Sequence, residues 1–124
     1  MFYRFPESST HALVRTAYTR PYPAPVSARA GMRVQPVTEG APVTDIPGWT
    51  WCRGPDGREG WVPDGWCVAE DGGLRLTRDF DALELTVAAG DRLRLIHSES
   101  GFIFAETVTG ATGWVPDAVL VLED

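Results

Sequence analysis

The sequence lacks the features on which most nucleic-acid-binding proteins depend. It contains no lysine, since all eleven basic residues are arginine, and its formal net charge is −6. A chain of this sign repels phosphate backbones, whose binding draws mainly on basic side chains that neutralise phosphates. No run of arginines forms a basic patch of the kind that binds nucleic acid or an anionic membrane surface. The composition therefore disfavours both partners.

Long apolar runs are also missing. No stretch of about 18 consecutive apolar residues occurs, so no membrane-spanning helix is expected. The first residues, Met1 to Pro6, lack the basic start, apolar stretch and small-residue cleavage site of a secretory signal. These absences predict a soluble cytoplasmic protein.

Cysteine, histidine and catalytic motifs are equally scarce. Cys52 and Cys67 are the only cysteines, too few for a disulfide framework, and we expect both to be buried thiols. His11 and His97 have no close ligand spacing with either thiol, so no metal site is predicted. There is no glycine-rich phosphate loop, no His-Glu-x-x-His and no Gly-x-Ser-x-Gly. The sequence therefore predicts a protein without catalytic activity or a cofactor.

Glycine and proline, in contrast, are abundant and separate many short runs of strand-forming residues. The chain has thirteen glycines and ten prolines. Residues 92–96 alternate polar and apolar side chains, and residues 102–108 are rich in aromatic and β-branched types, as half-buried antiparallel strands require. Gly and Asp at 55–58 and Gly at 109–112 favour hairpin turns. An all-β fold is predicted.

An internal repeat organises the chain. Residues 60–64, Gly-Trp-Val-Pro-Asp, recur without change at 113–117, an offset of 53 positions. The same offset places Trp49 on Phe102, Trp51 on Phe104 and Cys52 on Ala105. Self-similarity of this length indicates two copies of one structural unit.

The repeat extends towards the start of each copy with small changes in loop length. Residues 30–34 match 89–93 at an offset of 59, and Tyr18 matches Phe80 at an offset of 62. We therefore predict a tail at 1–11, a first domain at 12–69, a linker at 70–73 and a second domain at 74–124. Each domain is expected to enclose its own core.

An ordered set of motifs in the second copy carries a family resemblance. Its elements are Asp79-Phe80-Asp81-Ala82, Glu84-Leu85-Thr86-Val87-Ala88-Ala89-Gly90-Asp91, Phe102, Ala105, Gly113-Trp114-Val115-Pro116 and Val119-Leu120. The first copy shows Ala30-Gly31, Trp49, Cys52, Gly60-Trp61-Val62-Pro63 and Trp66-Cys67. In this order the motifs resemble the SH3 family, in a bacterial variant. The resemblance covers nearly the whole chain and implies two small SH3-like barrels in tandem.

The resemblance also implies a function and a set of binding residues. SH3 domains bind extended proline-containing peptides in grooves lined by aromatic side chains, because such a ligand is stiff before it binds. The implied groove residues are Tyr18, Trp49, Trp61, Pro63 and Trp66 in the first copy, and Phe80, Phe102, Trp114 and Pro116 in the second. Val119 stands where the last groove tyrosine is expected, so the first groove is the more complete. We predict a non-catalytic adaptor that binds a protein segment mainly through the first copy.

Other interpretations stay open at this point. Trp61 and Trp114 face either a ligand or the interface between the two barrels. In a structural module the aromatic faces would pack between barrels or against a homodimer partner, and a cell-wall peptide binder would require export. Asp64 and Asp117 follow prolines at the start of an expected single helical turn, where we expect N-caps rather than a catalytic pair.

Overall fold

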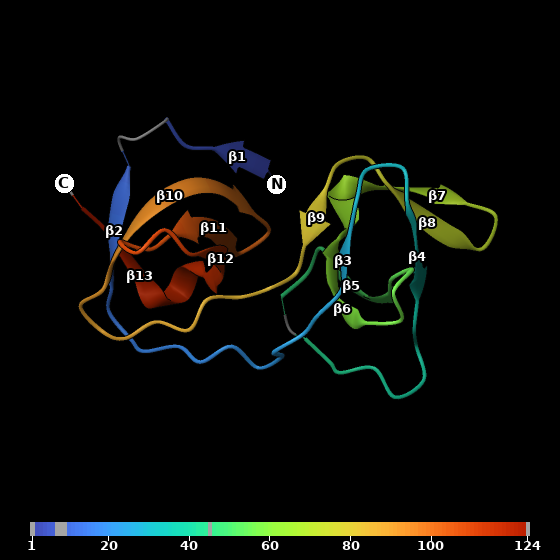
Figure 1. Ribbon diagram of the computed structural model, residues 1–124, viewed down its shortest axis with the longest axis horizontal. Helices are drawn as coiled ribbons and strands as arrows, with labels where there is room; N and C mark the ends of the chain where they lie inside the picture. Colours follow the sequence, from blue (N-terminus) through green and yellow to red (C-terminus); the bar gives the residue numbers. More distant parts are fainter. Residues whose placement is uncertain (1, 7–9, 45, 124) are drawn as a thin grey trace. The chain divides into compact units, whose positions relative to one another are not determined.

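The computed structural model describes residues 2–6, 10–44 and 46–123, and its secondary structure is all-β as predicted (Figure 1). The strands pair in antiparallel fashion, and two single 3-10 turns follow them at Asp64–Trp66 (η1) and Asp117–Val119 (η2). Within the described residues, no helix has the length and apolar character needed to span a membrane.

Contacts divide the chain into two compact units at positions that differ from the predicted boundaries. One unit, here called the inserted unit, is the continuous stretch Tyr22–Leu83. The other, the split unit, combines Met1–Pro21 with Glu84–Asp124. The repeat predicts the division at 70–73, which lies inside the inserted unit. Each unit therefore contains residues from both copies of the repeat.

The split unit is built around the long strand β10. Its strands are β1 (Phe2–Arg4), β2 (His11–Val14), β10 (Arg92–Glu99), β11 (Phe102–Glu106), β12 (Thr112–Pro116) and β13 (Leu120–Leu122). The sheet runs β12-β11-β10-β2-β13, and β1 also pairs with β10. Figure 1 shows the blue strand β2 from the start of the chain beside the orange and red strands of its end. In this position Leu13 lies opposite Arg92 on one side and Val121 on the other.

The inserted unit repeats this plan. Its strands are β3 (Ser27–Ala28), β4 (Arg33–Pro36), β5 (Trp49–Arg53), β6 (Glu59–Pro63), β7 (Cys67–Glu70), β8 (Gly73–Leu76) and β9 (Phe80–Asp81). One sheet runs β6-β5-β4-β8-β7, and β3 pairs with β9. Strand β8 occupies the place that β2 has in the split unit, because it lies between β4 and β7.

The correspondence holds residue by residue and shows that the two copies exchange their opening strands. Strand β8 follows β2 by the repeat offset of 62 positions, and Leu74 pairs with Val34 as Ala12 pairs with Leu93. The backbone N–H of Leu76 donates to Met32, and that of Val14 donates to the equivalent Asp91. The opening strand of each copy therefore completes the sheet of the other copy.

The turn between β7 and β8 explains the exchange. Glu70 lies opposite Gly73, so only Asp71 and Gly72 connect the strands, and both have positive φ angles of 27° and 82°. A two-residue turn with positive φ at both positions holds its flanking strands as an antiparallel hairpin. Residues 70–73 are therefore a hairpin turn within one sheet, and the prediction of an interdomain linker there was wrong.

The hairpins predicted inside each copy are present. Five-residue loops connect β5 to β6 and β11 to β12, and they contain Gly57 and Gly110 with φ angles of 85° and 91°. In each loop the first residue donates its N–H to the last one: Gly54 to Arg58 at 2.9 Å and Thr107 to Ala111 at 2.8 Å. These local contacts are equivalent in the two copies.

Each unit encloses apolar side chains from both copies. The core cluster of the split unit consists of Ala12, Val14, Leu85, Val87, Leu93, Leu95, Ile103, Ala105 and Val115. In the inserted unit the corresponding buried residues are Ala28, Val34, Cys52, Val62 and Leu76. Cys52 is a buried free thiol as predicted, and its burial raises its pKa to about 12. Cys67 is also free but only partly buried.

Candidate functional site

The strand exchange regroups the nine predicted binding residues. Tyr18 lies in the split unit with Phe102, Trp114 and Pro116, and Phe80 lies in the inserted unit with Trp49, Trp61, Pro63 and Trp66. The two opening aromatics pair with equivalent partners, since Tyr18 bridges to Val87 and Phe80 to Ala28. Each candidate groove therefore takes one aromatic residue from the other copy.

In the inserted unit the central predicted groove residues are buried. Trp66 and Phe80 are each 4% exposed, and their rings meet edge to face with centroids 5.5 Å apart. The guanidinium carbon of Arg78 lies 4.6 Å from the centre of the Trp66 ring, and Pro63 is fully buried. Trp49 keeps partial exposure. Pro63, Trp66 and Phe80 therefore act as packing residues in this structure.

A second aromatic group lies on the face of the β5–β6 hairpin opposite to Cys52 and Val62, and in it Trp51 is buried and Trp61 only partly exposed. Trp51 lies opposite Trp61, with ring centroids 5.2 Å apart, and Tyr22 contacts Trp51 at 5.1 Å. The indole N–H of Trp51 donates to Glu59 at 2.8 Å, and Arg53 forms an ion pair with the same carboxylate at 2.8 Å. Aromatic cross-strand pairs of this kind stabilise a sheet.

The split unit has the equivalent pair. Phe104 lies opposite Trp114 at a centroid distance of 5.4 Å, and His97 stacks on Phe104 at 5.1 Å. Trp51 and Phe104 had no role assigned from the sequence. Their position two residues after Trp49 and Phe102 was the available signal, because side chains two apart on a strand share a face.

The split unit brings partly exposed groove residues together with a carboxylate. The Tyr18 hydroxyl donates to Glu84, and Glu84 forms a parallel backbone bridge with Trp114 on strand β12. Farther along the same strand, Pro116 lies opposite Phe102. Tyr18, Phe102 and Pro116 each remain partly exposed, whereas Trp114 is buried. A continuous set of backbone pairings thus positions these aromatic and proline side chains.

Glu84 is the titratable group of this site. It is only 9% exposed, and its burial raises its pKa above the ordinary value. The hydrogen bond from Tyr18 and the charge of Arg20 act in the opposite direction, and the burial is the larger effect. The Arg20 backbone N–H donates to the Thr86 hydroxyl at 3.1 Å, which holds Arg20 beside the segment that follows Glu84.

Replacing Glu84 with glutamine is expected to remove one pH-dependent loss of stability. Because the folded-state pKa of Glu84 is raised, the folded protein keeps a proton that the unfolded chain has released, so stability falls as pH rises above about 4.5. Glutamine does not ionise and still accepts from Tyr18. Urea unfolding from pH 4 to pH 8 should show the variant gaining stability relative to wild type as pH rises. A constant difference between Glu84→Gln and wild type would contradict this account.

Asp64 and Asp117 do not cap the 3-10 turns as expected. The N-cap positions belong to Pro63 and Pro116, and neither turn has a side-chain cap hydrogen bond. Asp64 instead accepts a hydrogen bond from the Thr50 hydroxyl at 2.6 Å. The expectation failed because each proline, with extended backbone angles, stands one position ahead of the aspartate.

Among the residues that the structure describes, no group of three His, Cys, Asp or Glu side chains is arranged to hold a metal ion. No protein-family model, curated protein or solved structure matches this sequence. The geometry of each unit is therefore the basis for assigning a function.

Proposed function

We propose that this chain is a non-catalytic interaction module of two SH3-like barrels, and that its split unit binds a proline-containing protein segment. The observation that carries the proposal is that Tyr18, Phe102 and Pro116 are all partly exposed and are positioned by backbone pairings of the split unit, since Tyr18 bridges to Val87 and Phe102 lies opposite Pro116. The first copy was expected to carry most of the binding. The burial of Pro63, Trp66 and Phe80 now favours the split unit instead.

The chemistry of these side chains suits an extended, proline-containing ligand. Such a segment has few conformations to lose on binding, and its rings pack well on flat aromatic surfaces. The hydrogen bond from Tyr18 to Glu84 holds the tyrosine ring in place before the ligand arrives. A side chain that is already ordered loses less entropy on binding, which favours affinity.

A structural role for the aromatic residues of the inserted unit is the second candidate function. It is favoured by the edge-to-face contact of Trp66 with Phe80 and by Arg78 over the Trp66 ring. In this role the inserted unit packs against a second copy of the chain. Sedimentation equilibrium of the full chain distinguishes a monomer from a homodimer.

The binding proposal is tested by NMR titration of the full chain with proline-rich peptides and, in a separate arm, with muropeptides. Proline-rich peptides are expected to shift the amide signals of Tyr18, Phe102 and residues 114–116. Phe102→Ala should weaken binding about tenfold, because truncating a central aromatic contact costs about 1–2 kcal/mol. Trp49→Ala, at the equivalent position of the inserted unit, is the matched control and should change the affinity less than about twofold.

Three results would overturn the proposal. One is the absence of shifts with every proline-rich peptide. Another is a larger loss of affinity for Trp49→Ala than for Phe102→Ala, which would return the binding site to the inserted unit. Selective binding of muropeptides would favour the cell-wall alternative.

A further inference from the structure

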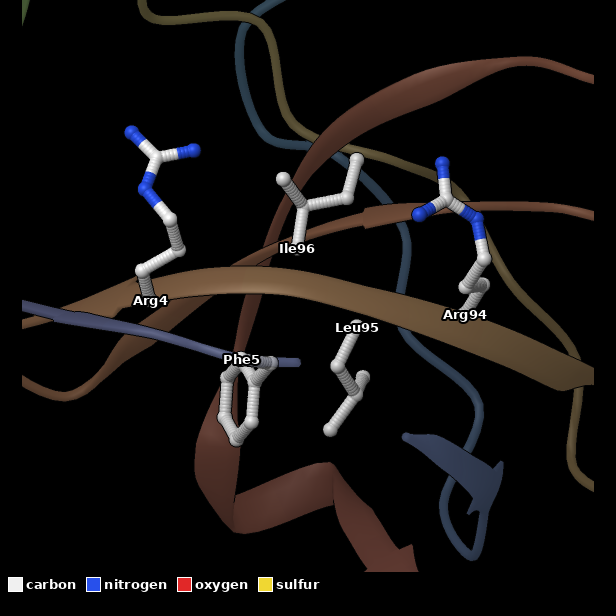
Figure 2. Close-up of a pocket in the computed structure, with 5 residues that line it drawn as sticks. All are labelled: Arg4, Phe5, Arg94, Leu95 and Ile96. Carbon is white, nitrogen blue, oxygen red and sulfur yellow. The ribbon is translucent and has the colours of Figure 1, made fainter. Parts of the chain in front are cut away.

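A cavity of about 360 Å³ lies in the split unit, and none of the proposed groove residues lines it. Its lining residues are Arg4, Phe5, Arg94, Leu95 and Ile96 (Figure 2). Pockets for small molecules typically measure about 300–1,000 Å³. This volume is therefore large enough for a small organic ligand.

The arrangement of strands explains why a cavity forms here. Strand β10 pairs with β2 through Arg92–Arg94 and with β1 through His97–Glu99, both along the same edge. Leu95 and Ile96 lie between these two pairings. Their backbone groups bond to the ends of the flanking segments, since Phe5 donates to Ile96 and Leu95 donates to Thr10, both at 2.9 Å. Neither β1 nor β2 is paired in register with Leu95 or Ile96, and the cavity lies beside these two residues.

Two guanidinium groups stand over this interval. Figure 2 shows the side chains of Arg4 and Arg94 on the same side of strand β10, with Ile96 between them. Arg94 is anchored by Glu106, whose Oε1 lies 3.0 Å from both Nε and Nη2 of the arginine. Among the described residues Arg4 has no ion-pair partner, and its guanidinium carbon lies 5.8 Å from the Phe2 ring centre. Within the part of the chain that the structure describes, the cavity therefore carries one positive charge without an ion-pair partner, beside the apolar side chain of Ile96.

We propose that this cavity binds a small organic anion, with a carboxylate or phosphate head at Arg4 and an apolar body against Ile96. Guanidinium groups match the planar, multidentate geometry of such oxyanions. In a chain with a net charge of −6, the site is a local exception to an acidic surface. It shares no residue with the proposed peptide groove, so either proposal can fail alone.

The probes are benzoate, phenyl phosphate and inorganic phosphate, each titrated into the full chain and followed by NMR. Benzoate and phenyl phosphate at about 10 mM, enough to detect millimolar binding, are expected to shift the amides of Arg4, Phe5, Leu95 and Ile96. Inorganic phosphate should bind more weakly, because it has no apolar body. Arg4→Gln should weaken binding of the aromatic anions about tenfold, the value of one charge-assisted hydrogen bond.

Arg29→Gln is the control, since Arg29 is an exposed arginine of the inserted unit, and it should leave the affinities unchanged. Thermal unfolding of Arg4→Gln should match wild type, which separates loss of binding from loss of structure. The proposal is overturned if neither aromatic anion shifts the cavity amides, or if Arg4→Gln binds them as wild type does. Equal affinity for inorganic phosphate and phenyl phosphate would contradict the proposed contact between the apolar body of the ligand and Ile96.

Discussion

Replacing Leu76 with alanine is expected to destabilise residues 22–83 by about 2–5 kcal/mol, the usual cost of this truncation in a packed core, and to leave the split unit near its wild-type stability. Leu76 is fully buried in strand β8, which lies between β4 and β7 of the inserted unit. Under the tandem arrangement predicted from the sequence, the same residue belongs to the second domain. The location of the damage therefore distinguishes the two arrangements.

Native-state hydrogen exchange measures this location directly. The amides of Val34, Cys52 and Val62 should lose protection, while those of Leu93 and Ala105 should keep it. Val68→Ala, at an exposed position on the neighbouring strand β7, is the control and should change protection little. Loss of protection confined to residues 84–124 would contradict the strand exchange.

A fragment of residues 22–83 is expected to fold alone, whereas a fragment of residues 12–69 is not. The first fragment contains every strand of the inserted unit, and its length lies in the range of about 55–65 residues in which many small domains fold. The second fragment lacks β8, so β4 and β7 lose their shared neighbour. It also retains β2 without its partners β10 and β13.

Amide dispersion in two-dimensional NMR spectra of the two fragments provides the measurement. The strand exchange predicts dispersed amide signals and cooperative unfolding for residues 22–83. For residues 12–69 it predicts the poorly dispersed amide signals of an unfolded chain. The reverse result, with β2 replacing β8 in a folded 12–69 fragment, would support the tandem arrangement.

Local pairing within each copy could be predicted from the sequence. The β5–β6 and β11–β12 hairpins follow from alternating apolar residues and from Gly57 and Gly110 in the turns. The repeat placed equivalent residues correctly, since Trp51 faces Trp61 as Phe104 faces Trp114. These contacts are close in sequence, so the pattern of a short segment is enough to define them.

The partner of each opening strand could not be read from the repeat. Because the two copies are similar, β2 and β8 carry comparable apolar residues and suit either acceptor sheet. The connection decides between the two pairings, and Asp71-Gly72 is a strong hairpin signal that was interpreted as part of a linker. A loop of two residues fixes β7 as one neighbour of β8, and β4 pairs with its other edge.

The candidate site also differs from the one predicted, because the opening strands pair differently. The Phe80 ring packs against Trp66 in the inserted unit, and Tyr18 lies beside Glu84 in the split unit. Neither contact is visible in the sequence, because each joins residues from different copies. That these groove residues bind a ligand stays a prediction. Its first test is now the Phe102→Ala variant rather than Trp49→Ala.

Interstrand nuclear Overhauser effects in the full-length protein test the strand exchange most directly. The account predicts backbone contacts between Leu13 and Val121 and between Arg75 and Val68, the register partners in the two units. Contacts between Leu13 and Val68, together with contacts between Arg75 and Val121, would instead show each opening strand in its own copy and contradict the account.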